Sequence, residues 1–446
     1  MAKPKFLIKT WGCQMNVLDS DKLAGTLMDL GYEPTPSEDE AEVILLNTCS
    51  VREGPENKVF TELGRLRPLK KNKLKVLGVV GCVAQQEKAA IFSRAPYVDL
   101  VMGPRSIMHL PELLEQARHQ KALEAEFRDD SVLYPGGKIS RSHPVKAFVT
   151  VMEGCSKKCA YCIVPFTRGR EIYRPLESIL SETREAVDSG FTEIELLGQN
   201  VNCWKDGATK GFADLLEAVS GVEGVKRLRF TTSHPRHFPL EAALLMAERP
   251  NICHYLHLPL QSGSTKILKA MRRQYDKEWY LDLVRQIRSR VPDIALSTDV
   301  IVGFPGETEE DFLETLEVVR EAEYDAIFSF RYSPRPGTPA AKAEPVAGEV
   351  ARERHQRLLD AQLPIQTRRL KAFAGRTIEV LVEGRSKRGT EWMGRSGDNK
   401  VVNFTSTGQP SVNTYLQVTV ERAGANSLFG KAVTAKNEAP GAKCKA

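Results

Sequence analysis

Three cysteines in one short segment constrain this chain more than any other feature. Cys155, Cys159 and Cys162 follow a strand-like run at 148–152 and have the spacing C-x3-C-x2-C. Iron–sulfur cubes are normally held by four thiolates, so three ligands leave one iron with an open coordination position. A structural zinc site would need a fourth Cys or His close by, and residues 163–170 contain neither. The spacing therefore predicts a [4Fe-4S] cluster with one reactive iron.

The length and composition of the chain fit a globular protein of several domains. Its 446 residues are 41% apolar and 27% charged, and about three domains are expected at this length. Residues 1–10 hold no apolar export segment, and no apolar run approaches the roughly 18 residues of a membrane span. Nine cysteines in such a chain favour metal or redox use in a reducing compartment. We therefore expect a cytoplasmic protein with no membrane partner.

Residues 1–118 alternate short apolar runs with helical segments, a pattern that predicts a small, doubly wound parallel sheet. Three of the apolar runs, at 5–9, 43–46 and 75–80, each precede a cysteine: Cys13, Cys49 and Cys82. Because the carboxyl ends of parallel strands share one edge of the sheet, these thiols are expected to converge there. They are thus predicted to hold a second [4Fe-4S] cluster. The alternative is three unrelated core cysteines.

The middle of the chain predicts a larger α/β unit. Residues 119–144 lose all periodicity and are expected to form a linker. Residues 145–372 then alternate amphipathic helices with six strand-like runs, at 147–152, 193–198, 226–232, 254–258, 295–302 and 326–332. This number of strands predicts a partial (β/α)6 barrel, in which catalysis takes place at the carboxyl rim of the strands.

Polar or glycine-bearing segments follow four of these strands and would lie across the same rim. A glycine after a strand usually marks only a turn, but the shared position of the four segments favours contact with a polar cofactor. From them we select as cofactor-binding residues Gln199, Ser233, Gln261 and Val302. Cys203 and Cys253 lie outside both sets of three cysteines and are expected to be packing residues.

The C-terminal part of the chain is basic and strand-like. Residues 373–436 contain short β-type runs separated by Gly and Asn, which predicts a small antiparallel barrel, and 437–446 are expected to be a disordered tail. Residues 367–446 hold 14 Lys or Arg against 6 Asp or Glu, a net charge of +8 in a chain whose total is +6. Cations beside Trp392 and Phe404 suit RNA, although a solvated basic face is the alternative. The predicted substrate-binding residues are Arg385, Lys387, Arg388, Trp392 and Arg395.

Taken together, these motifs resemble the methylthiotransferase family of radical S-adenosylmethionine enzymes. Residues 12–16 (GCQMN), 47–53 (NTCSVRE) and 81–82 (GC) resemble the N-terminal domain of that family, and 154–170 resemble its radical core. The C-terminal barrel resembles a TRAM domain, a module associated with RNA binding. The residues around Cys13 and Cys49 are similar to those of the branch that modifies tRNA beside the anticodon.

This resemblance implies two [4Fe-4S] clusters and S-adenosylmethionine, used both as radical source and as methyl donor. The cluster on Cys155, Cys159 and Cys162 would generate a 5′-deoxyadenosyl radical, with Tyr161 near the adenine of the cofactor. The cluster on Cys13, Cys49 and Cys82 would hold the sulfur to be delivered. The implied reaction is methylthiolation of C2 of N(6)-isopentenyladenosine at position 37 of tRNA.

The implied partners are tRNA, a sulfur source and an external electron donor such as a flavodoxin-type protein. Three alternatives remain at this point. Two keep the chemistry and change the substrate, to a side chain of a ribosomal protein or to threonylcarbamoyladenosine in tRNA. The third is a non-enzymatic RNA-binding sensor, which would gain nothing from two clusters that each have a bare iron.

Overall fold

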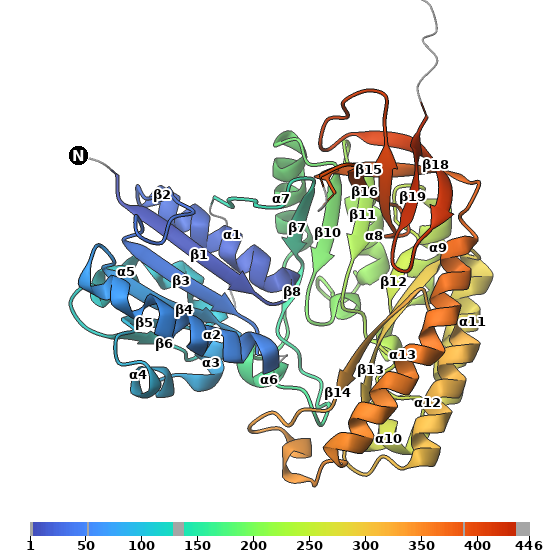
Figure 1. Cartoon of the computed structure of the whole chain (residues 1–446), viewed down its shortest axis with the longest axis horizontal. Helices are drawn as coiled ribbons and strands as arrows, with labels where there is room; N and C mark the ends of the chain where they lie inside the picture. Colours follow the sequence, from blue (N-terminus) through green and yellow to red (C-terminus); the bar gives the residue numbers. More distant parts are fainter. Residues whose placement is uncertain (1–2, 51–52, 128–137, 387–388, 434–446) are drawn as a thin grey trace, which may run out of the picture.

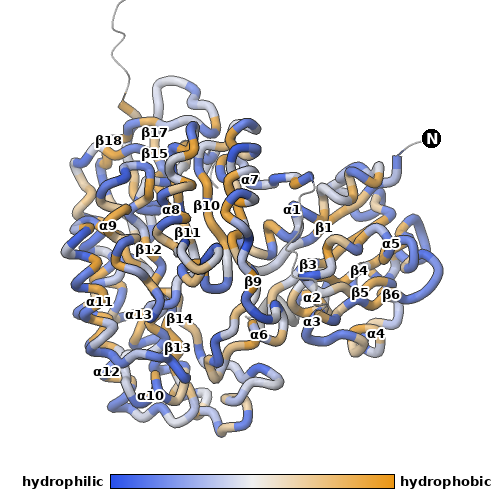
Figure 2. Tube along the Cα trace, turned by 180° about the vertical axis from the view of Figure 1, so that it is seen from behind, coloured by the Kyte–Doolittle hydropathy of each residue, from blue (hydrophilic) through white to orange (hydrophobic). Residues whose placement is uncertain are grey.

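The computed structural model describes residues 3–50, 53–127, 138–386 and 389–433. They form three units in chain order: an N-terminal sheet with helices, a central partial barrel and a small closed barrel (Figure 1). Hydrophobic residues gather along the strands and on the helix faces that cover them (Figure 2). No helix within these ranges is long and apolar enough to cross a membrane.

The N-terminal unit is a six-stranded parallel sheet with the order β2-β1-β3-β4-β5-β6. Its strands are β1 (Lys5–Trp11), β2 (Glu33–Pro34), β3 (Val43–Thr48), β4 (Val76–Gly81), β5 (Leu100–Met102) and β6 (Ala122–Glu124). One face is covered by α1 (Gln14–Asp29) and α5 (Leu110–Ala117). The other is covered by α2 (Glu53–Leu66), α3 (Cys82–Glu87) and α4 (Ala90–Arg94). Helices on both faces confirm the doubly wound arrangement.

This sheet extends beyond residue 118, where a linker was expected to begin. Strand β6 pairs in parallel with β5, with Ala122 opposite Leu100, and completes the edge of the sheet. A strand of three residues is too short to display an alternating pattern of apolar and polar side chains. The start of the expected linker therefore belongs to the N-terminal unit.

The central unit consists of two three-stranded parallel sheets, β11-β10-β7 and β12-β13-β14. Their strands are β7 (Lys146–Thr150), β10 (Glu193–Leu197), β11 (Arg227–Phe230), β12 (Tyr255–His257), β13 (Ala295–Val302) and β14 (Ala326–Arg331). The outer layer is formed by α7 (Leu176–Asp188), α8 (Phe212–Ser220), α9 (Leu240–Glu248), α11 (Lys277–Arg290), α12 (Glu309–Ala322) and α13 (Gly348–Lys371). A parallel bridge between Leu228 and Ile252 joins the sheets, so β7 and β14 are the end strands. The predicted partial barrel is confirmed.

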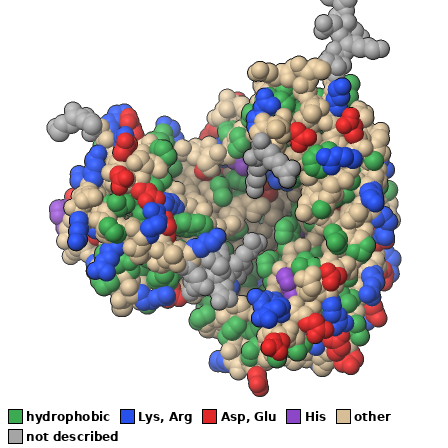
Figure 3. All heavy atoms as spheres, in the orientation of Figure 1, with side chains coloured by type: hydrophobic (Ala, Val, Ile, Leu, Met, Phe, Trp, Pro, Cys, Tyr) green, Lys and Arg blue, Asp and Glu red, His purple; other side chains and the backbone are tan. Residues whose placement is uncertain are grey.

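Helix α1 of the N-terminal unit packs into the open side of this barrel. Met15 and Leu18 of α1 contact Phe148 of β7 and Leu197 of β10. Residues next to these two along the strands, such as Val149, belong to the core beneath the outer helices, so Phe148 and Leu197 point into the barrel. The carboxyl edge of the N-terminal sheet consequently faces the carboxyl rim of the barrel, across the hollow visible in Figure 3.

The C-terminal unit is a closed barrel with the strand order β15-β16-β17-β19-β18. Its strands are β15 (Thr377–Arg385), β16 (Trp392–Ser396), β17 (Val401–Thr405), β18 (Tyr415–Ala423) and β19 (Leu428–Ala432). All neighbouring strands are antiparallel except β17 and β19. This is the small barrel that the sequence predicts.

The small barrel is fastened to the amino ends of the central strands. Arg227 and Arg229 of β11 donate hydrogen bonds of 2.7–3.0 Å to backbone carbonyl oxygens of the small barrel. Lys400 of the small barrel forms a buried ion pair with Asp325, which immediately precedes β14. The small barrel therefore closes the end of the central barrel that lies opposite the rim.

Candidate active site

The loop at residues 154–162, called here the rim loop, is pinned at its base to the strand ends around it. Gly154 has a φ of +79°, and a Cβ there would lie 2.0 Å from the carbonyl oxygen of Arg170, so only glycine fits. The N–H of Gly154 donates to Oε1 of Gln199 at 2.5 Å, and that of Cys155 to the carbonyl of Gly169 at 3.0 Å. Gln199, which the sequence predicts to be a cofactor ligand, thus holds the loop in place.

Cys155, Cys159 and Cys162, the rim trio, are all partly buried. Burial raises the pKa of Cys155 to about 11 and that of Cys162 to about 12. Cys159 accepts a hydrogen bond from Nη1 of Arg273 at 3.5 Å. A thiol that is neutral in such a place becomes a thiolate when a metal binds, because the metal's charge displaces the proton. Ionisation of Cys155 and Cys162 is therefore expected to accompany metal binding.

Cys13, Cys49 and Cys82, the N-terminal trio, meet at one edge of the N-terminal sheet. Strands β1, β3 and β4 are neighbours, and one of these cysteines follows each strand. A Cβ on Gly12 would lie 2.8 Å from Cβ of Cys49. Gly81 has a φ of +87°, and a Cβ there would lie 2.3 Å from Oδ1 of Asn47. The backbone thus approaches the thiols so closely that glycine is required beside them.

The N-terminal trio differs electrostatically from the rim trio. Hydrogen bonds to Cys49, together with the charge of Arg168, lower the pKa of Cys13 to about 6 and that of Cys82 to about 7. The same bonds raise the pKa of Cys49, the thiol that retains its proton. Cys49 and Cys82 are buried, whereas Cys13 is open to solvent. Cys13 and Cys82 therefore ionise near neutral pH, so the site is already anionic before iron binds.

The arrangement of the thiols suits clusters better than single ions. Among the residues that the structure describes, no three Cys, His, Asp or Glu side chains lie close enough together to hold one metal ion. A cubane differs from such a site because each thiolate binds a different iron. Three cysteines in each trio are the number that a [4Fe-4S] cluster with one free iron requires.

Buried polar atoms near the rim indicate where a polar cofactor binds. Thr150 Oγ1, Asn200 Oδ1, Ser233 Oγ and His234 Nδ1 have no hydrogen-bond partner within the described part of the chain. Because buried polar groups almost always have partners, such atoms point to a ligand. A cavity of about 480 Å³, lined by Cys159 and His234 among others, lies at the same place and has the size of a small-molecule site. These atoms and the cavity beside them suit a polar small molecule.

The other predicted cofactor residues occupy different positions relative to the rim. Ser233 is buried and contributes one of the unpartnered atoms. Gln261 has a φ of +72°, and its backbone is held between Asp299 and Ile301 at the end of β13. The Tyr161 ring packs edge-on against Phe304, with centroids 6.4 Å apart.

The side chain of Val302 cannot make the predicted cofactor contact. It is fully buried in the core between the central sheets and the outer helices, and only its backbone lies at the rim. Alternation along β13 places Val302 on the same face as Val300, away from the barrel interior.

In the small barrel, the predicted RNA-binding residues separate into distinct groups. Arg385 is exposed and lies over the Trp392 ring at 4.0 Å from its centroid. Arg395 instead forms an ion pair with Glu383 at 3.0 Å. Lys387 and Arg388 lie outside the described residues.

Phe404 cannot stack on a base, because its ring is fully buried in the core of the small barrel. That expectation was wrong. The neighbouring Asn403, only half-buried, lies on the opposite face of β17, as the alternation of a strand requires.

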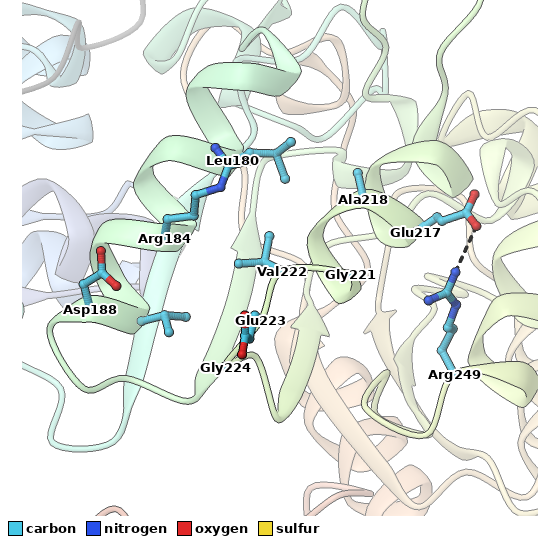
Figure 4. Close-up of a pocket in the computed structure, with 11 residues that line it drawn as sticks. Leu180, Arg184, Asp188, Glu217, Ala218, Gly221, Val222, Glu223, Gly224 and Arg249 are labelled. Atoms are coloured by element: carbon cyan, nitrogen blue, oxygen red, sulfur yellow. Dashed lines mark hydrogen bonds and ion pairs between the residues drawn. The ribbon is translucent and has the colours of Figure 1, made fainter.

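A larger cavity, about 680 Å³, lies among the outer helices and plays no part in this site. It is formed by the ends of α7 and α8 and by the loop after α8, with Arg184 and Val222 among its lining residues (Figure 4). An exposed ion pair between Glu217 and Arg249 at 3.0 Å borders it. No cysteine of either trio lines this cavity.

Three residues near the thiols escape prediction from sequence. Arg273 lies in the turn between α10 (Thr265–Ala270) and α11 and reaches Cys159 across 114 positions of sequence. Arg168 and Asp19 form a buried ion pair between the central and N-terminal units. No spacing rule links such distant residues. The only sequence signal was that Arg168 belongs to the segment of the rim trio.

Comparison with protein-family models divides the chain in the same way as the fold does. Residues 5–103 match "Uncharacterized protein family UPF0004", 149–319 match the "Radical SAM superfamily" and 371–433 match the "TRAM domain".

The chain also resembles individual proteins along most of its length. It is 44% identical over 435 residues to the tRNA-2-methylthio-N(6)-dimethylallyladenosine synthase of Koribacter versatilis, covering 96% of this chain and 98% of that one. The Bacillus subtilis synthase of the same name is also 44% identical, with 96% and 86% covered. The radical S-adenosylmethionine methyltransferase TsrM of Kitasatospora setae shares the fold, with a TM-score of 0.55, 16% identity and 76% and 75% covered.

Proposed function

This chain belongs to the family of tRNA-2-methylthio-N(6)-dimethylallyladenosine synthases, and we propose how its residues divide the work of that reaction. The reaction is radical methylthiolation of C2 of N(6)-dimethylallyladenosine, the isopentenyl-modified base beside the tRNA anticodon. C2 is an aromatic carbon that bears only hydrogen, so polar catalysis offers it no leaving group. When bound, two [4Fe-4S] clusters and S-adenosylmethionine supply the radical and the methylated sulfur. The protein itself binds, orients and excludes water.

The packing of α1 is the observation that carries this assignment. Met15 and Leu18 lie against Phe148 and Leu197 inside the barrel, and Cys13 directly precedes α1. This contact turns the N-terminal trio toward the rim that holds the other trio. A radical formed on one side and a sulfur held on the other can then meet at a single base. The apolar contacts of α1 also keep bulk water from this side of the barrel.

Within this scheme the rim trio holds the radical-forming cluster and the N-terminal trio holds the sulfur-bearing one. The unpartnered atoms of Ser233, Asn200 and Thr150 bind polar groups of S-adenosylmethionine. Tyr161, braced by Phe304, packs beside the adenine of that cofactor. Gln199 keeps the rim loop at a fixed distance from β10 through its bond to Gly154.

We assign two further partners by charge and access, and place the reaction in the cytoplasm. Lys157, Lys158 and Arg272 surround the cavity at Cys159. Their charge suits an acidic electron carrier of the flavodoxin type, since complementary charge speeds encounter. The solvent-open side of Cys13 provides an entry for an external sulfur source.

The small barrel binds the phosphate backbone of the tRNA in this proposal, and Arg385 carries a part of that contact. Trp392 holds the exposed guanidinium in one orientation, which lowers the entropy lost on binding. Arg385→Ala is expected to raise KM for tRNA about fivefold or more with little change in kcat, and to lower the salt dependence of binding by about one phosphate contact.

The matched control for this change is Arg422→Ala. Arg422 lies over Phe429 at 3.7 Å, a pair of the same kind elsewhere on the barrel. Equal effects of the two substitutions on KM would contradict a local contact at Arg385 and favour attraction by overall charge.

A mass-spectrometric assay tests the substrate. Reconstituted protein, S-adenosylmethionine, a chemical reductant and sulfide are incubated with tRNA bearing dimethylallyladenosine, threonylcarbamoyladenosine or unmodified adenosine at position 37. We expect a methylthio product with the dimethylallyl substrate alone, because the relatives are named for that nucleoside.

Two results would overturn this substrate. Product from threonylcarbamoyladenosine would move the enzyme to another branch of the family. A methylthio group on a ribosomal protein, with none on tRNA, would change the substrate class. Ribosomes from cells lacking the enzyme provide the material for that comparison.

A further inference from the structure

Arg168 links the two sets of cysteines. It follows α6 (Val164–Thr167), the short helix that comes directly after the rim loop, and α6 lies beside α3 of the N-terminal unit (Figures 1 and 2). Its side chain is only 3% exposed, and its Nη2 donates to Oδ2 of Asp19 at 2.5 Å. Asp19 lies on α1, six positions after Cys13. One guanidinium therefore crosses from the radical core to the edge where the N-terminal trio lies.

This ion pair leaves polar atoms without partners. Nη1 of Arg168 and Oδ1 of Asp19 are both buried and make no hydrogen bond within the described part of the chain. A buried guanidinium N–H without an acceptor is costly, and a charged donor costs more than a neutral one. Such an atom in a native protein indicates a ligand that completes it.

The free donor lies close to the N-terminal trio. Arg168 bonds to Asp19 of α1, the helix that begins directly after Cys13. Cys82 begins α3, the helix that packs against α6. The unpartnered Nη1 is thus near the thiols and, with them, near whatever they bind.

The unpartnered atom of Arg168 is a cationic N–H donor, so the group that completes it must be an acceptor, and an anion is the acceptor that it binds most strongly. Arg105 lies on the same side, and its Nη2 donates to the carbonyl of Arg170 at 2.5 Å. Asp19 and Glu153 are the nearby acids, and burial raises the pKa of Asp19. In the structure Oδ1 of Asp19 does not accept from Nη1, since both atoms are without a partner in the described part of the chain.

We propose that Arg168 is a positioning residue that binds, through Nη1, the anionic sulfur held at the N-terminal trio. The ligand is hydrosulfide or methanethiolate, and this inference rests on the sulfur-holding role proposed above. A [4Fe-4S] cluster bound by three thiolates would keep a net negative charge, so a cation beside it would strengthen the binding of a further sulfur anion. The planar guanidinium can keep one N–H on Asp19 while another reaches the sulfur. No bond is broken and no electron moves in this step.

The position of Arg168 in the chain gives this contact a second consequence. Arg168 comes six residues after Cys162, so the group that recognises the sulfur belongs to the segment that holds the other cluster. Sulfur bound at the N-terminal trio would complete a contact between the two units. One side chain therefore links the sulfur at the N-terminal trio to the segment that holds the other cluster.

The test uses the full chain carrying Cys155→Ala, Cys159→Ala and Cys162→Ala, so that only the N-terminal cluster forms. After reconstitution, methanethiolate or hydrosulfide is titrated into the reduced protein and binding is followed by the electron paramagnetic resonance spectrum. In this background Arg168→Gln is expected to raise the Kd of both anions at least tenfold. Arg168→Lys keeps the positive charge but not the planar guanidinium with its several N–H donors. Its Kd should lie between those of the parent and Arg168→Gln.

Arg354→Gln is the matched control. Arg354 of α13 forms a buried pair with Glu307 at 2.8 Å, of the same kind as the pair of Arg168. The Arg354→Gln substitution should leave the Kd of both anions unchanged. Iron content of about four per chain in every variant shows that the remaining cluster is present. If Arg168→Gln fails to take up iron, the Kd of Arg168→Lys is the deciding measurement.

The outcomes separate this inference from the proposed function. If the parent binds the anions and Arg168→Gln binds them with the same Kd, the role of Arg168 is overturned and the proposed function stands. Where Arg168→Gln takes up no iron, the same comparison is made with Arg168→Lys. No binding of either anion by the parent would overturn the sulfur-holding role itself, and the inference with it. A raised Kd in Arg354→Gln as well would show a general effect of losing a buried ion pair, and would also overturn it.

Discussion

Replacing Cys159 with alanine is expected to abolish both methylthiolation and the formation of 5′-deoxyadenosine. Two remaining thiols cannot hold a cubane, and no His, Cys, Asp or Glu lines the adjoining cavity to replace the lost ligand, apart from His234. The Nδ1 of His234 is buried and has no hydrogen-bond partner in the described part of the chain, and we propose that it contacts the cofactor. Iron should fall from about eight to about four per chain, because the N-terminal cluster is unaffected. Iron analysis and chromatography of the nucleoside products measure the two effects.

Cys253→Ala provides the control for this change. Cys253 is buried, belongs to neither trio and lies at the amino end of β12. Its replacement removes one thiol at the other end of the barrel, so iron content and activity should stay within about twofold of the parent. A Cys159→Ala protein that still releases 5′-deoxyadenosine would contradict the assignment of the rim trio.

Replacing Cys82 with alanine is expected to separate the two halves of the reaction. The N-terminal cluster should be lost, whereas the rim loop keeps its ligands and its bonds to Gln199 and Gly169. Such a protein should cleave S-adenosylmethionine to 5′-deoxyadenosine and transfer no sulfur. Iron should again be about four per chain, this time with the radical-forming cluster retained. The measurement is the ratio of 5′-deoxyadenosine to methylthio product. We expect 5′-deoxyadenosine with no detectable methylthio product.

Cys203→Ala is the appropriate comparison for Cys82. Cys203 is a partly buried thiol that accepts a hydrogen bond from Asn200 at 2.8 Å and belongs to neither trio. Its loss should leave the ratio of the two products near that of the parent. Methylthio product from the Cys82→Ala protein would show that sulfur reaches the base without the N-terminal cluster. The three cysteines of that edge would then be structural.

The convergence of Cys13, Cys49 and Cys82 could be predicted because it follows from the geometry of a parallel sheet. Each cysteine follows a strand, and the carboxyl ends of β1, β3 and β4 share one edge whatever lies between them in sequence. The rim trio could be predicted for a simpler reason, since its three ligands lie within eight residues. Local sequence patterns are therefore enough to predict both sets of cysteines.

The errors arise where a side chain had to be placed on one face of a strand. Phe404 points into a core, and the alternation of β17 already contained that information, whereas a backbone contact of Val302 with the cofactor stays a prediction. The pair of Arg168 and Asp19 is a different case. It joins residues 149 positions apart on separate units, so it depends on how α1 packs against the open side of the barrel. No pattern within a single segment specifies that contact.

The hydrogen bonds of Arg227 and Arg229 bear on how this architecture is inherited. A terminal domain is readily lost or exchanged in evolution when few contacts cross its boundary. Here two guanidinium groups of a central strand end on backbone carbonyls of the small barrel. Both guanidinium groups also pair with Glu193 of β10, so the small barrel completes a set of partners that begins inside the central unit. A descendant that discarded the small barrel would lose these acceptors and expose to water a part of the central unit that is now covered, so the contacts favour inheritance of the two parts together.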